Sequence, residues 1–163
     1  MKSLRIALSI FVVLLTTAAL AQSNTQAAFE KIKSLQGSWA GKAGGRDVQV
    51  SYRVTSGGSA VMSEIRGEED MISMFHLDGE RLLMTHYCGA GNQPRMVGTV
   101  SPDGKTITFN FLDGTNLLSS QPGHMERMVL TMLDANHHTE EWSFLAQDGK
   151  MHQHEVFDLQ RSK

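Results

Sequence analysis

The chain has 163 residues, with 15 Lys and Arg against 17 Asp and Glu, a formal net charge of −2 and a single cysteine. A mildly acidic balance with no basic run argues against nucleic acid as a partner. One cysteine excludes a disulfide framework within the chain. The length is that of one ordinary domain, which can bury a core without disulfide bonds or structural metals.

The N-terminal residues have the order of a secretory signal peptide. Lys2 and Arg5 precede an apolar run at residues 6–15, and small residues follow up to Ala21. This pattern predicts a cleavable signal peptide over residues 1–21, and hence a periplasmic or secreted protein. The apolar run is shorter than the roughly 20 residues of a membrane-spanning helix, so no transmembrane segment is expected. Without the two basic residues the formal charge is about −4.

The mature chain, residues 22–163, is expected to be a single domain that begins with a short helix. Three apolar residues recur at helical spacing before a glycine: Phe29, Ile32 and Leu35, followed by Gly37. This spacing predicts a helix over residues 27–35, and Gly37 is a helix stop.

From residue 37 onward the apolar period changes to two. Val48, Val50, Tyr52 and Val54 alternate with polar residues, and glycine-containing turns recur at short, regular intervals. This pattern is typical of antiparallel hairpins. About ten strands are predicted: 37–42, 46–54, 60–66, 70–77, 81–88, 95–100, 106–112, 124–133, 138–146 and 150–161.

No stretch after residue 37 has the period and length of a crossover helix, so a parallel sheet is not expected. A set of about ten short antiparallel strands must protect its edges, and closure into a barrel removes them altogether. The sequence therefore predicts an all-β, up-and-down antiparallel barrel with the short N-terminal helix plugging one end. A two-sheet sandwich is the structural alternative.

The first predicted strand carries a known signature. Gly37-Ser38-Trp39 opens this strand directly after the helix, and it resembles the G-x-W motif of the calycin superfamily, which includes lipocalins, fatty-acid-binding proteins and nitrobindins. The resemblance implies a lipocalin-like barrel in which a basic residue of the last strand packs across the tryptophan. Arg161 stands in the corresponding place.

The last strand also resembles that of one branch of the superfamily. The run from Gln153 to Arg161 is similar to the C-terminal segment of nitrobindins, which implies haem as cofactor and His154 as its axial ligand. If Phe157 and Leu159 face inward, alternation turns His154 outward. Only a bulge or a position at the barrel mouth then brings its ring to a haem iron.

The strand predicted over residues 81–88 carries the most unusual polar pair. Leu82, Met84, His86 and Cys88 share one face, and the apolar members make that face the interior. Three functional readings stay open for His86 and Cys88: a thiolate nucleophile activated by imidazole, two metal ligands, or polar groups that orient a ligand in an apolar pocket. An ordinary core histidine beside a small hydrophobic cysteine is the structural reading.

A nucleophile also needs donors for an oxyanion. The glycine-flanked loop over residues 89–95 offers backbone N–H groups, and Arg95 offers a positive charge. Asn116 and His124 bracket a predicted loop over residues 113–123 and are further polar candidates.

The strand predicted over residues 138–146 places polar groups inside the barrel. Trp142 and Phe144 set the interior face, and alternation carries His138 and Glu140 inward as well. A buried carboxylate without a partner is costly, so Glu140 is expected to pair with His138, His124 or Arg95, or to lie at the open mouth.

These observations favour a secreted or periplasmic binding protein for a small apolar or amphiphilic ligand held in the barrel. Eight residues form the predicted ligand-binding set: His86, Cys88, Asn92, Arg95, Asn116, His124, His138 and Trp142. The residues themselves predict no cofactor and no metal site, and no catalytic residue is assigned. The alternatives are a haem-binding protein that uses His154 and a small enzyme that uses Cys88 and His86.

Overall fold

The computed structural model describes residues 24–67, 70–120 and 122–162, without the side chains of residues 151–154. Within these residues one helix, 24–34, precedes ten strands and a short 3-10 turn, η1 (Ser56–Gly58). The strands are β1 (Gly37–Ala43), β2 (Arg46–Thr55), β3 (Ala60–Arg66), β4 (Met71–Asp78), β5 (Arg81–Tyr87), β6 (Gln93–Val100), β7 (Thr106–Thr115), β8 (Gly123–Asp134), β9 (His137–Ala146) and β10 (Met151–Arg161). The predicted signal peptide lies outside the described residues.

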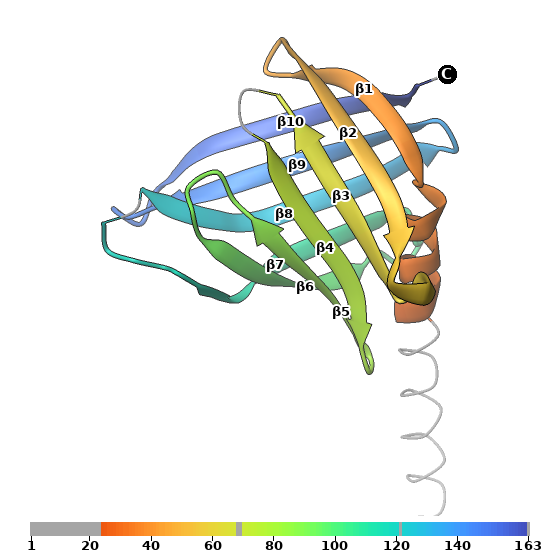
Figure 1. Cartoon of the computed structure of the whole chain (residues 1–163), viewed down its shortest axis with the longest axis horizontal. Coiled ribbons are helices and arrows are strands. Elements are labelled where there is room, and N and C mark those ends of the chain that lie inside the picture. Colours follow the sequence, from red (N-terminus) through yellow and green to blue (C-terminus); the bar gives the residue numbers. More distant parts are fainter. Residues whose placement is uncertain (1–23, 68–69, 121, 163) are drawn as a thin grey trace, which may run out of the picture.

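The strands close into a barrel. Each strand pairs antiparallel with its neighbours in sequence, and β1 also pairs with β10. Figure 1 shows the N-terminal helix at the end of the barrel where β1 begins. The predicted ten-stranded antiparallel barrel is therefore confirmed, and the two-sheet sandwich is excluded.

Alternation sorts the side chains as expected. On β5, Leu82, Met84 and His86 are each at most 1% exposed, whereas Tyr87 is 49% exposed. On β9, His138 and Glu140 are buried together with Trp142. The predicted interior face of both strands is confirmed.

The helix fills one end of the barrel. Ala28, Phe29, Ile32 and Leu35 are buried in the same core cluster as the strand side chains at that end. Burial of each of the three larger side chains contributes about 2 kcal/mol to folding. This end of the barrel is consequently occupied by the protein itself.

The tryptophan of the G-x-W motif is held by the helix and by the last strand. Trp39 donates its Nε1–H to the backbone oxygen of Leu35 at 2.7 Å. The Arg161 guanidinium lies 4.3 Å from the centre of the Trp39 ring and donates to the backbone oxygens of Ser34, Gln36 and Ala135. The contact expected between the motif and the last strand is present.

The boundaries differ from the prediction where polar residues continue an element. The helix begins at residue 24 instead of 27, because residues 24–26 carry no apolar side chain that marks the helical period. Thr25 nevertheless donates to the backbone oxygen of Glu80 and ties the first turn to the barrel.

The loop predicted over residues 113–123 is shorter than expected. β7 continues to Thr115, which pairs with Gln93 of β6. A register shift between Arg95 and Met96 accompanies this extension. Single-strand alternation does not detect such a bulge, and the prediction ended the strand too early.

The contact between β1 and β10 leaves no room for a side chain at Gly41. A Cβ atom there would lie 1.7 Å from the backbone oxygen of Asp158. We expect Gly41→Ala to destabilise the protein by more than about 2 kcal/mol, because backbone atoms of the closing strand pair must move apart. Urea unfolding of the variant measures this loss.

Gly67→Ala is the matched control, since a Cβ atom at Gly67 meets nothing within 4 Å and the residue lies outside the strands. Its stability should stay within about 0.5 kcal/mol of the parent. Equal stability of the two variants would contradict the tight closure of the barrel at β1 and β10.

Candidate functional site

A cavity of about 550 Å³ lies at the end of the barrel away from the helix. Its wall is mostly apolar and comes from Ile65, Met71, Met125, Trp142, Phe144 and Phe157. These residues lie on β3, β4, β8, β9 and β10, near the strand ends that are farthest from the helix. The volume falls within the range of pockets that enclose small organic ligands, roughly 300–1,000 Å³.

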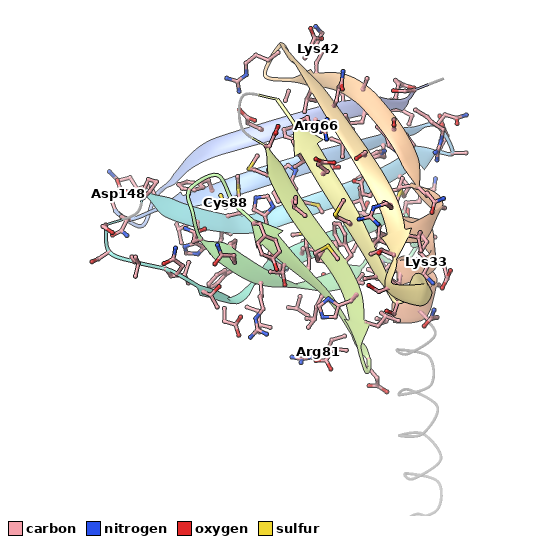
Figure 2. All side chains as sticks on the ribbon, viewed as in Figure 1. Lys33, Lys42, Arg66, Arg81, Cys88 and Asp148 are labelled. Carbon is pink, nitrogen blue, oxygen red and sulfur yellow. The ribbon has the colours of Figure 1, made fainter. Side chains whose placement is uncertain are left out.

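The polar side chains of the cavity wall are His86, Cys88 and Glu155. Figure 2 shows Cys88 and the helix residue Lys33 on opposite sides of the barrel. Cys88 is half-buried, and Glu155 forms an ion pair with Arg46 of β2. His86 and Cys88, the pair predicted to share the interior face, therefore do meet the same cavity.

His86 is fixed on one side only. Its Nδ1 is 2.9 Å from the hydroxyl oxygen of Ser73 on the adjacent strand β4, and its ring packs against Trp142 with 4.8 Å between ring centres. Its Nε2 is buried and has no hydrogen-bond partner among the described residues. Burial lowers the pKa of His86 from 6.5 to about 4, although the Glu140 carboxylate partly opposes this shift. The ring is uncharged at neutral pH.

Trp142 is in turn held by a buried carboxylate. Glu140 is 1% exposed, and its Oε2 accepts a hydrogen bond from the Trp142 Nε1–H at 2.9 Å. Its Oε1 accepts a hydrogen bond from the hydroxyl of Tyr52. Burial, together with the nearby Glu140 carboxylate, raises the pKa of Tyr52 well above its ordinary value, so Tyr52 remains a donor. A chain of contacts thus connects Tyr52, Glu140, Trp142 and His86.

One of the three predicted partners of Glu140 lies close to its carboxylate. His138 Nε2 lies 3.6 Å from Glu140 Oε1, as one of the predicted pairings required. His124 and Arg95, the other predicted partners, lie elsewhere. The two close donors, Tyr52 and Trp142, were not anticipated.

The loop between β5 and β6 is stabilised by its own hydrogen bonds. The Cys88 N–H donates to the backbone oxygen of Asn92, and the Gly91 N–H donates to that of Cys88. Asn92 is buried and donates its Nδ2–H to the backbone oxygen of Gly123 at 2.6 Å. One of the backbone donors considered for an oxyanion, the Gly91 N–H, is therefore used within the turn.

Three further predicted residues lie outside the cavity wall. Arg95 is exposed and forms a surface ion pair with Asp113. Asn116 is also exposed and donates to the backbone oxygen of Gly91 at 2.6 Å. His124 packs on Phe111 with 4.4 Å between ring centres and lines a smaller neighbouring depression. The structure does not bring these side chains together with His86.

His138 also lies apart from the cavity, deep in the closed half of the barrel. Its ring centre is 4.3 Å from that of Trp39 in an edge-to-face contact. Of the eight predicted ligand-binding residues, the cavity wall includes three: His86, Cys88 and Trp142.

The predicted haem ligand falls in a part of the chain whose side chains are not described. The backbone register pairs His154 with Ser143, and Glu155 with Trp142. Val156 is 41% exposed and Phe157 is 5% exposed, which confirms the alternation expected for this strand. Haem binding by His154 stays a prediction.

Several residues of the site were missed by sequence reasoning. Ser73 and Met71 share the interior parity of β4 with Phe75, so the same alternation that identified His86 could have found them. Tyr52 belongs to the alternating apolar pattern of its predicted strand, but its donor role depends on the position of Glu140 on a strand distant in sequence. Glu155 reaches the cavity because it pairs in register with Trp142.

The described residues include neither a candidate metal site nor a candidate membrane-spanning helix. No group of three or more His, Cys, Asp or Glu side chains there is arranged to hold a metal ion. None of the helices in that part of the chain is long and apolar enough to cross a bilayer.

Comparison of the sequence with protein families and with curated proteins gives no match. Among solved structures the chain is similar to the crystal structure of Rv2717c from M. tuberculosis, with a TM-score of 0.59 and 18% sequence identity. The alignment covers 83% of this chain and 98% of that chain. The likeness shows a shared barrel fold.

The lowered pKa of His86 makes the stability of the fold depend on pH. The folded protein resists protonation of this ring down to about pH 4, whereas the unfolded chain takes up the proton near pH 6.5. Titration of His86 therefore leaves the free energy of unfolding unchanged above pH 6.5 and lowers it as the pH falls from 6.5 to about 4. Between pH 7 and 4 the parent should lose roughly 3 kcal/mol more than His86→Leu does.

Urea unfolding at a series of pH values measures this difference directly. Because both proteins share all other titrating groups, only the difference between the two pH profiles matters. Parallel profiles for the parent and His86→Leu would show that His86 titrates normally and is not buried in the cavity wall.

Proposed function

We propose that this protein is a periplasmic or secreted binding protein that holds a small apolar or amphiphilic molecule at the open end of its barrel. The observation that carries the proposal is the cavity of about 550 Å³, whose apolar wall surrounds a neutral, partly unsatisfied histidine. Small-molecule sites in proteins combine an apolar wall with few polar groups that fix orientation.

The division of the barrel interior supports this function. The helix and the core side chains fill one half, where Phe29, Ile32 and Trp39 are at most 2% exposed. Protein interiors normally pack to a density that leaves few voids larger than a water molecule. A cavity of this size therefore marks a binding site more naturally than a packing defect.

The lining also suits ligands of varied shape. Met71 and Met125 have flexible thioether side chains that adjust to different apolar surfaces. The contact of Arg161 with Trp39 supports the resemblance to the calycin superfamily. That superfamily includes fatty-acid-binding proteins, which hold small apolar molecules. Export from the cytoplasm rests on the signal-peptide pattern of residues 1–21.

Binding of Nile red, an uncharged dye that fluoresces in apolar surroundings, tests the function. We expect saturable binding with one dye per protein. Ala90 lies in the cavity wall, and Ala90→Phe should weaken dye binding at least about tenfold because the larger side chain occupies the ligand volume. Fluorescence titration measures both affinities.

Ala40→Phe is the control, because Ala40 is exposed on β1 and lies outside the cavity wall. This variant should bind the dye as the parent does. A parent protein that does not bind Nile red, or equal binding by the two variants, would contradict the proposed cavity site.

A further inference from the structure

One polar side chain of the cavity wall has a buried nitrogen without a hydrogen-bond partner among the described residues. His86 lines the cavity, its Nδ1 is engaged by Ser73, and its buried Nε2 has no partner among the described residues. A buried polar atom without a hydrogen bond is costly, so a ligand that completes this bond gains affinity at this point. The ring is held in place by Ser73 and Trp142, so the contact is directional.

The charges around the cavity do not suit an anionic ligand. Its wall includes the carboxylate of Glu155, and Glu140 lies behind Trp142. Among the described lining residues there is no Lys or Arg. A carboxylate headgroup would lose its water without gaining a cationic partner, and it would lie near two acidic groups.

The same charges are already balanced, which disfavours a cationic ligand. Glu155 is paired with Arg46, and both oxygens of Glu140 accept hydrogen bonds, from Tyr52 and Trp142. Among the described side chains around the cavity, a buried ammonium group would therefore find no uncommitted carboxylate. An uncharged headgroup avoids both penalties.

A hydroxyl group matches the free nitrogen in either tautomer of the ring. If Nδ1–H donates to Ser73, then Nε2 accepts a hydrogen bond. If the Ser73 hydroxyl donates to Nδ1, then Nε2–H is a donor. A hydroxyl both donates and accepts, whereas a ketone or an ether accepts only.

We propose, on the basis of the binding function above, that the natural ligand is an uncharged amphiphile whose hydroxyl group hydrogen-bonds to His86 Nε2 while its apolar body fills the cavity. This assigns His86 as the residue that selects the headgroup. Trp142 and Ser73 position the ring, and the apolar wall supplies most of the affinity.

Displacement of Nile red by three compounds with the same alkyl chain tests the headgroup. These are decanol, decanoate and decylamine, compared at a pH slightly above neutral, where the latter two are charged. We expect decanol to displace the dye at a concentration at least about tenfold lower than either charged compound. Equal or stronger displacement by decanoate or decylamine would overturn the inference.

His86→Leu tests the assigned residue. We expect this variant to lose about tenfold more affinity for decanol than for Nile red, each compared with the parent. His124→Leu is the control, because this histidine lies outside the cavity wall, and its affinities should match those of the parent. Unchanged decanol binding in His86→Leu would overturn the assignment.

Ser73→Ala provides a second variant that keeps the imidazole and removes its positioning contact. Ser73→Ala should also narrow the difference in binding affinity between decanol and decanoate. Circular dichroism checks that each variant is folded.

The two proposals fail in different ways. Absence of Nile red binding by the parent contradicts the binding function and this inference together, whereas normal dye binding with the wrong headgroup order contradicts this inference alone.

Discussion

The carboxylate of Glu140, which is 1% exposed inside the barrel, imposes the constraint on which the site depends. A buried carboxylate must receive hydrogen bonds or it destabilises the fold by several kcal/mol. Tyr52 and Trp142 provide these bonds, and each is thereby fixed in orientation. Because the Trp142 ring packs against His86, the requirement of one acid sets the geometry of the cavity wall.

The barrel combines this network with an unequal filling of its two halves. Closure of β1 on β10 gives a cylinder whose interior residues are fixed by alternation. The helix and the pair formed by Trp39 and Arg161 seal one end. In the described structure no element seals the other end, where the strands enclose a cavity with His86 in its wall. The fold and the proposed binding function are therefore linked through one asymmetric feature of the described residues, the helix that fills one end of the barrel.

Much of the fold followed from local patterns in the sequence. The period-two alternation of Val48, Val50 and Tyr52 and the helical spacing of Phe29 and Ile32 reflect burial on one face, which is a local property. The same rule placed His86 and Trp142 inside the barrel. Strand ends were less well predicted, because the bulge beside Arg95 depends on pairing with a second strand.

The composition of the site was harder to predict, since alternation gives the face of a residue but not its height along the barrel axis. His138 and His86 both point inward, yet one packs on Trp39 near the helix and the other lines the cavity. Height depends on strand register and barrel shear, which long-range pairing determines. For this reason His138 was grouped with His86 in one predicted site, although the two histidines lie in different halves of the barrel.

The state of the His86 ring is the most direct test of this account. Nitrogen-15 NMR of the histidine side chains at neutral pH, with the His86 signals identified by their loss in His86→Leu, reports protonation and hydrogen bonding at each ring nitrogen. The account predicts an uncharged ring whose Nε2 signal shifts when decanol is added, while the His138 signals do not change. A doubly protonated His86, or an Nε2 signal that does not respond to saturating decanol, would contradict it.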